Sequence, residues 1–137
     1  MKGDDRQKRA ALLNPIKNPK TDGDYLVQLR HKLAPSGLEA TGGVIVDLFY
    51  VPGKLIIDVD NYDKYLTFFE TRSQGYKTFE ELAANILDDL NNELVPKWIM
   101  LNVISEHAHT VHCVSVEERQ PKWNNDDLLR NLRRRLS

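Results

Sequence analysis

The sequence predicts an α+β fold, in which a four-stranded antiparallel sheet carries two helices on one face. Apolar residues recur at helical spacing over residues 78–94, and a shorter amphipathic stretch precedes them at residues 61–72. Two strand-like stretches lie before these helices and two lie after them. The order is then strand, strand, helix, helix, strand, strand. Because both strand pairs need a cover for one face and only one helical layer is available, an antiparallel four-stranded sheet with two helices on one side follows.

Length and charge set the broad class of the protein. The 137 residues are 41% hydrophobic and 28% charged, which is enough for one buried core. The formal net charge of -1 gives no overall attraction to nucleic acid or to a membrane. No apolar run approaches the ~20 residues that span a bilayer, and the N-terminal stretch lacks the apolar core of a secretion signal, so we expect a cytoplasmic protein. We divide the chain into a charged, irregular lead-in (residues 1–23), the sheet domain (24–120) and a C-terminal helix (121–137).

The longer predicted helix has a defined start and stop. Thr78 and Glu81 form a capping-box pair, and Pro96 follows two residues after the last apolar position. The aromatic residues of the shorter helix follow helical spacing, which favours the core over a stacking platform; they are Tyr62, Tyr65, Phe68 and Phe69. A short charged helix is expected at residues 4–13. The tail from residue 123 is expected to be a helix with a solvated arginine face, so a nucleic-acid partner is not expected.

The strands are predicted from β-branched and aromatic runs. Residues 44–51 and 55–59 flank Pro52 and Gly53 and predict a hairpin. Residues 98–104 and 108–116 predict a second hairpin with its turn at residues 105–107. Residues 25–31 alternate apolar with polar side chains and predict a further strand at a sheet edge.

Both faces of the predicted sheet are apolar. Val44, Val46, Leu48 and Tyr50 share one face, and Ile45, Phe49 and Val51 share the other. The second hairpin alternates in the same way. Because one helical layer cannot bury both sets and exposed strand edges promote association, we expect a closed homo-oligomer.

Several short sequence segments resemble those of a known protein family. They are Asn14-Pro15 with Asp24-Tyr25, Ala34-Pro35, Tyr50-Val51-Pro52, Asp89-Leu90 and Pro96-Lys97-Trp98-Ile99. With the ββααββ order, they resemble the tunnelling fold, or T-fold, of purine- and pterin-handling enzymes. The strings are similar to those of the NADPH-dependent nitrile reductases of queuosine biosynthesis, which reduce 7-cyano-7-deazaguanine. The resemblance implies NADPH as the cofactor of an active reductase, and a barrel of edge-joined sheets with ligand sites between subunits.

The sequence departs from this family where the chemistry is carried out. In the family, a cysteine before a proline attacks the nitrile to form a thioimide, and an aspartate supplies a proton. Here Ala34 precedes Pro35, and the aspartate position falls on Thr41, or on Glu39 if the loop is shifted. The family's Arg-Gly-Gly and Glu-Ser-Lys motifs fall on residues 107–109 and 58–60, which match them poorly.

These departures predict a diverged member that binds a purine-like or deazapurine ligand without thioimide chemistry. An active reductase, or another deazapurine- or pterin-transforming enzyme with displaced catalytic groups, is one alternative, so enzymatic activity stays open. A structural or assembly protein is the other.

The resemblance also implies a carboxylate that anchors the base at the start of the second helix, because an ionised carboxylate accepts two hydrogen bonds from neighbouring ring N–H groups. Counting back from Pro96 without gaps gives Glu80, and a gap after Phe79 gives Glu81. Glu81 already has a capping role. Glu80 is therefore the stronger of the two candidates.

Three histidines and the one cysteine are the other chemically interesting residues. His107 and His109 would share a strand face, but His112 would point to the opposite face, so we expect no metal site. Cys113 lies in an apolar strand. We expect it to be a buried hydrophobic residue and not a nucleophile.

Overall fold

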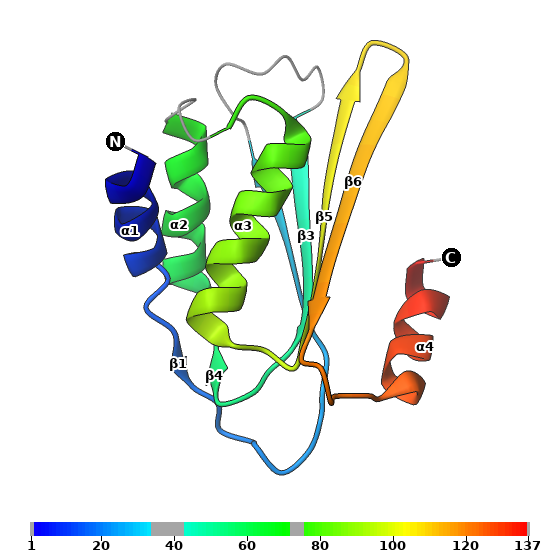
Figure 1. The fold of residues 1–137 in the computed structure, drawn as a ribbon. Helices are drawn as coiled ribbons and strands as arrows, with labels where there is room; N and C mark the ends of the chain where they lie inside the picture. Colours follow the sequence, from blue (N-terminus) through cyan, green and yellow to red (C-terminus); the bar gives the residue numbers. More distant parts are fainter. Residues whose placement is uncertain (1, 34–42, 72–75, 137) are drawn as a thin grey trace.

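The computed structural model describes residues 2–33, 43–71 and 76–136 as one mixed α+β unit (Figure 1). Its elements follow in this order: α1 (Lys2–Ala11), β1 (Ile16–Lys17), β2 (Val27–Leu33), β3 (Val44–Val51), β4 (Leu55–Ile56), α2 (Val59–Thr71), α3 (Phe79–Leu94), β5 (Trp98–His107), β6 (Thr110–Arg119) and α4 (Asp126–Leu136). The central part of the chain therefore has the predicted ββααββ order, formed by β2, β3, α2, α3, β5 and β6.

The main sheet has the strand order β2-β3-β5-β6, and every neighbouring pair is antiparallel. The predicted first hairpin is wrong in its second strand. β4 stops at Ile56 and pairs with β1 in a separate two-stranded sheet, while β3 pairs with β2 and β5. Val59, predicted as a strand residue, begins α2. The edge strand predicted at residues 25–31 is thus the real partner of β3.

The second hairpin is longer than predicted, and its predicted turn is misplaced. β5 continues through residues 105–107, and the reversal occurs at Ala108 and His109, between paired His107 and Thr110. Ala108 takes a positive φ of 54°. A two-residue reversal between antiparallel strands commonly requires positive φ, which alanine adopts less readily than glycine, so the sequence carries no turn residue to mark it.

The main core lies between the sheet and the helices. On β3 it takes Val44, Val46, Leu48 and Tyr50, as the alternation predicts. From α2 it takes Tyr62, Tyr65 and Phe69, and from α3 it takes Leu82, Ile86 and Leu90, among others. Phe68 is half-buried. The helical periodicity of both segments therefore places their apolar stripes against one face of the sheet.

α1 joins the two predicted helices on this side of the molecule, packing on α2 and α3 (Figure 1). Its Arg9 reaches the buried carboxylate of Asp89 on α3, with Nε 2.6 Å from Oδ2, and the hydroxyl of Tyr65 on α2 donates to the same oxygen at 2.6 Å. Burial alone would lower the pKa of Arg9, but the hydrogen bond and charge of Asp89 raise it above its usual value. This network joins three helices through one carboxylate.

The opposite face of the sheet is partly covered, whereas a single helical layer would leave it exposed. Leu129 and Leu132 of α4 pack with Phe49, Val51 and Trp98, which form a second buried cluster. The predicted alternation of β3 and β5 is confirmed, since these side chains face away from the main core. α4 covers one end of the face, so the premise that only one helical layer is available was wrong. Within the described residues, no helix is long and apolar enough to cross a membrane.

Candidate functional site

The candidate site is the N-terminal end of α3, where the helix meets the sheet. Thr78 caps the helix, and its hydroxyl accepts from the backbone N–H of Glu81 at 3.1 Å. Glu81 Oε2 accepts from the backbone N–H of Lys77 at 3.1 Å, so its carboxylate is used to close the first turn. Of the two carboxylates predicted from the sequence, Glu81 therefore has a structural role that explains it.

Glu80 has a different environment. Its side chain is 61% exposed, and Oε2 lies 3.3 Å from Nε2 of His112 on β6, whose side chain is 39% exposed. The contact is an ion pair when the imidazole is protonated. The Phe79 ring packs edge-on against this imidazole, with ring centroids 5.6 Å apart and planes at 85°. The result is an accessible carboxylate beside an imidazole that also contacts an aromatic ring.

A buried hydroxyl lies next to this pair. Ser105 on β5 is the register partner of His112 and of Val44, and Val44 pairs with Leu33. The row Leu33, Val44, Ser105 and His112 therefore crosses the sheet at this end. Ser105 is buried, and its Oγ has no hydrogen-bond partner among the described atoms. A buried hydroxyl without a partner carries a desolvation cost, so Ser105 marks a place where a further polar group would be stabilised.

The other residues predicted from the family resemblance fall outside this group. Ala34, Glu39 and Thr41 lie outside the described residues. Leu33 and Gly43, which flank that segment, lie at the same end of the sheet as Ser105. Asp58, from one poorly matching motif, accepts from the backbone N–H groups of Asp60 and Asn61 and caps the start of α2. The other poor match, residues 107–109, is the end of β5 and the turn after it.

The predicted histidine geometry is corrected by the position of the turn. His107 ends β5 and His109 lies in the turn, so they do not share a regular strand face. In the part of the chain that the structure describes, no group of three or more His, Cys, Asp or Glu residues could hold a metal ion. Cys113 is exposed, which contradicts its prediction as a buried residue, because it lies on the edge strand β6 and on the face opposite to Val114 and Val116, which pack against the main core.

The pairing of Glu80 with His112 and the buried position of Ser105 were not predicted from the sequence. These residues come from α3, β6 and β5, and only the packing of the helix across the hairpin brings them together. Alternation along β6 does place His112 on the helix-facing side with Val114 and Val116. Combined with the sheet order, that signal would have placed His112 near α3.

Asp24 belongs to one of the short sequence segments that resemble the nitrile reductases, and it has a structural role at the other end of the sheet. Its carboxylate accepts from Lys97 Nζ at 2.7 Å, from Trp123 Nε1 at 3.0 Å and from Asn125 Nδ2 at 3.2 Å. The hydrogen bond from Lys97 is the largest cause that holds the pKa of Asp24 below its usual value, and burial acts against it. Asp24 thereby ties the start of β5 to the segment that leads into α4.

Comparison with known proteins supports the fold. No protein-family model matches the chain, and a search of curated protein sequences finds no match. Among solved structures, the chain is similar to the crystal structure of the archaeosine synthase QueF-Like in the apo form, with a TM-score of 0.57. The two are 18% identical, and the match covers 72% of this chain and 96% of that chain. The chain therefore shares the T-fold architecture of that protein.

Proposed function

We propose that this chain is a T-fold protein of the queuosine and archaeosine pathways that binds a purine-like or deazapurine base at the N-terminal end of α3. Glu80 is the anchor of the base in this proposal. The observation that carries it is the exposed Glu80 carboxylate held beside His112, in a fold shared with an archaeosine synthase. Glu81 cannot do the same without giving up its bond to the Lys77 N–H.

The chemistry of such a site is recognition through hydrogen bonds. The two oxygens of Glu80 would accept from the adjacent ring amide and exocyclic amino N–H groups of the base. An acidic side chain in the first turn of a helix also interacts favourably with the positive end of the helix dipole. His112 contacts the anchor, and Ser105, its register partner on β5, is a further polar group in the same row of the sheet.

Isothermal titration calorimetry with 7-cyano-7-deazaguanine tests this proposal. Glu80→Ala should weaken binding by about 1.5 to 3 kcal/mol, the scale of hydrogen bonds to a charged group. Asp88→Asn is a matched control, because Asp88 is also an exposed carboxylate of α3 and lies two turns further along the helix. Equal affinity for the wild type and Glu80→Ala would exclude Glu80 as the anchor.

We also propose that the protein lacks nitrile reductase activity, because Ala34 stands where the family has its nucleophilic cysteine. Protein, NADPH and 7-cyano-7-deazaguanine should show no loss of absorbance at the nicotinamide band. Protein-dependent NADPH consumption would show that the protein is a reductase. If that turnover persisted in Cys113→Ser, the reductase would not need a cysteine.

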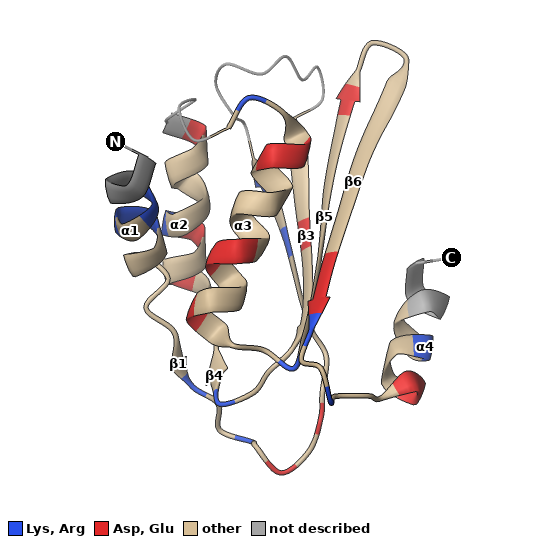
Figure 2. Cartoon of the chain, in the orientation of Figure 1, with Lys and Arg blue, Asp and Glu red and all other residues tan. Residues whose placement is uncertain are grey.

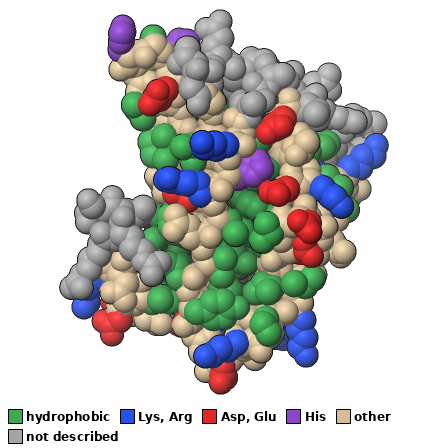
Figure 3. Space-filling model, turned by 180° about the vertical axis from the view of Figure 1, so that it is seen from behind, with side chains coloured by type: hydrophobic (Ala, Val, Ile, Leu, Met, Phe, Trp, Pro, Cys, Tyr) green, Lys and Arg blue, Asp and Glu red, His purple; other side chains and the backbone are tan. Residues whose placement is uncertain are grey.

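Assembly with further copies of the chain is the second part of the proposed function. β2 and β6 are the edge strands of the main sheet, and β6 is exposed or half-buried along its whole length. Seen from behind, hydrophobic side chains gather on the lower half of the surface (Figure 3). Closing the edges between copies would bury this surface and give a barrel with sites between subunits.

Sedimentation equilibrium at micromolar concentration measures this assembly. A mass several times 15.8 kDa is expected. A single species of 15.8 kDa across that concentration range would contradict the closed oligomer. Glu80 could then still anchor a base within one chain, so calorimetry and sedimentation test separate parts of the proposal.

A further inference from the structure

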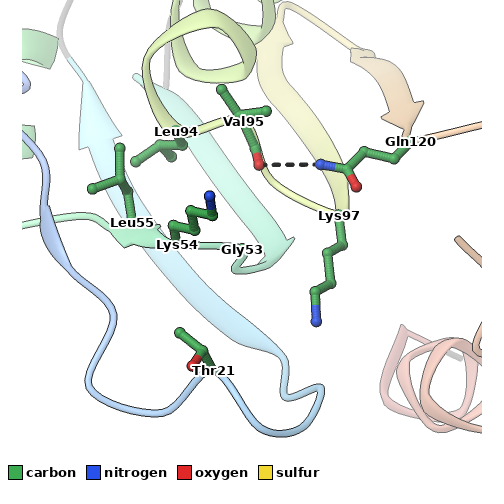
Figure 4. A pocket seen from close by; sticks show the side chains of 8 residues that line it. All are labelled: Thr21, Gly53, Lys54, Leu55, Leu94, Val95, Lys97 and Gln120. Atoms are coloured by element: carbon green, nitrogen blue, oxygen red, sulfur yellow. Dashed lines mark hydrogen bonds between the residues drawn. The ribbon is translucent and has the colours of Figure 1, made fainter.

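A hollow of about 570 Å³ opens at the far end of α3 from Glu80. It lies where the C-terminus of α3, the start of β4 and the start of β5 meet (Figure 4). With a rise of 1.5 Å per residue, the 16 residues of α3 separate the two ends by about 24 Å. The hollow is therefore a different place from the base site proposed above.

The walls of the hollow combine apolar and cationic groups. Leu55, Leu94 and Val95 supply the apolar surface. The Lys54 side chain extends into the space between Leu55 and Lys97 (Figure 4). A second hollow of about 550 Å³ adjoins the first, shares Lys97 with it, and adds Lys122 and Trp123. Three lysines thus line these two adjoining hollows, which are together called the depression below and which have apolar and aromatic walls.

The charge of this depression is not balanced by its own lining. Among the described residues that line the two hollows there is no Asp or Glu. Lys97 is paired with Asp24, which lies outside both linings. No ion pair is formed by Lys54 or Lys122 within the described residues. Lysine and arginine positions recur along the lower connections of the molecule, where acidic positions also occur, and acidic residues follow α3 (Figure 2).

The shape of the depression is fixed by backbone contacts. Val95 ends α3 with a positive φ of 46°, and its carbonyl accepts from Gln120 Nε2 at 3.3 Å. A Cβ added to Gly53 would approach that same carbonyl to 3.0 Å, so glycine allows β4 to lie close to the end of α3. The Lys97 N–H donates to the Val51 carbonyl at 2.9 Å. The Gln120 N–H donates to the Lys97 carbonyl at 3.0 Å, so backbone hydrogen bonds tie the wall at Lys97 to β3 and to the residue after β6.

We propose that this depression binds a small organic anion, with a carboxylate, sulfonate or phosphate group on an apolar body. The acidic group would contact the ammonium group of Lys54, and the apolar body would cover Leu55, Leu94 and Val95. Hollows of this size with mostly apolar walls and a few polar groups are typical of small-molecule sites. An uncompensated ammonium group at the rim favours an anion over a neutral compound of the same shape.

Stabilisation of α3 is the competing explanation for a lysine at position 54. α3 has no basic residue in its last turn, and a cation near its C-terminus would complement the helix dipole. In that case Lys54→Gln would lower the free energy of unfolding without any change in ligand affinity. The two roles can be separated because Lys54 is exposed and its replacement does not disturb the core.

The test uses 8-anilinonaphthalene-1-sulfonate as the probe and N-phenyl-1-naphthylamine, which has the same rings without the sulfonate, as the neutral control. NMR titration of the full chain should shift the amide signals of Lys54, Val95 and Gln120. Lys54→Gln should lower the affinity for the sulfonate about two- to fivefold, which is the scale of one exposed charge contact. The same substitution should leave the affinity for the neutral amine unchanged. Lys54→Arg should restore the affinity.

Lys77→Gln is the matched control variant, since Lys77 is an exposed lysine at the opposite end of α3. It should not change the affinity for the sulfonate. The proposal is overturned if the shifts fall elsewhere, if Lys77→Gln and Lys54→Gln weaken the probe equally, or if Lys54→Gln alters only the free energy of unfolding. Failure of the Glu80 calorimetry would not affect this result, because the two sites lie at opposite ends of α3.

Discussion

Replacing Arg9 by methionine is the most direct test of how the helical layer is held together. Asp89 is 1% exposed, and Arg9 is its closest cation, with Nε at 2.6 Å and Nη2 at 3.4 Å from the two carboxylate oxygens. Methionine keeps the length and apolar contact of the stem but removes the charge. Removing one partner of a buried ion pair leaves the other charge uncompensated, which costs about 3–5 kcal/mol.

The structure places Arg9→Met near the lower end of that range. Tyr65 still donates to Asp89 in the variant, and Arg6 lies 3.7 Å from its other oxygen. The guanidinium also lies 5.6 Å from the Phe69 ring centroid, so a cation–π contact is lost as well. We therefore expect a loss of about 3 kcal/mol in the free energy of unfolding.

Urea denaturation followed by tryptophan fluorescence measures this loss, and Arg6→Met is the matched control on the same helix. The Arg6 side chain is 52% exposed, so its contact with Asp89 should contribute at most about 1 kcal/mol. The triple variant Arg9→Met, Asp89→Leu and Tyr65→Phe should recover most of the stability, since it removes the three buried polar members together and leaves only the exposed Arg6. Similar losses for Arg9→Met and Arg6→Met would refute the buried network as the link between the three helices.

Three further predictions test other parts of the structure. The native pKa of Asp24 is lowered, so its stabilising contribution is present above the pKa of the unfolded carboxyl and is lost as pH falls through the native pKa. The difference in Tm between the wild type and Asp24→Asn should accordingly be constant from neutral pH to about 5 and close below about 4, and a difference that widens in acid would contradict this role. Thr78→Ala should cost about 1 kcal/mol while Thr78→Ser costs only a few tenths, because serine keeps the capping hydroxyl; equal losses in urea denaturation would argue against the cap. Leu132→Ala should cost about 2 kcal/mol or more and shift the emission of Trp98, whereas unchanged stability and emission would show that α4 does not pack on the sheet.

The local signals in the sequence were reliable where one segment contains the whole cause. Thr78 and Glu81 lie on the first turn of α3, and the stripe from Phe79 to Leu94 faces the core, because capping and amphipathic periodicity act within a few residues. The alternation along β3 likewise separated the two faces of the sheet correctly. The family resemblance led to the T-fold, which the match with the archaeosine synthase supports.

Strand pairing was decided by the tertiary structure. The short β-rich run after Pro52 has the composition of a hairpin partner, but Asn18 draws this connection toward β1 through the Asn18 N–H to Lys54 carbonyl bond and the Asn18 side chain to Gly53 carbonyl bond. Propensity cannot tell which of two available strands β3 will choose, because pairing energy depends on neighbours distant in sequence. The position of α4 on the opposite face also depends on residues distant in sequence. Trp123 and Asn125, which lead into α4, donate to Asp24 about 100 residues earlier in the chain.

The candidate site was likewise predicted in part from the sequence and decided in part by the tertiary structure. The sequence, through the family resemblance, narrowed the anchor to Glu80 or Glu81, and the capping geometry assigned Glu81 to the helix. Only the folded chain brings His112 to Glu80, because a residue on α3 and one on β6 meet through packing of the helix across the hairpin. Side-chain periodicity fixes which face a residue takes on its own element, and the packing of elements fixes what that face meets.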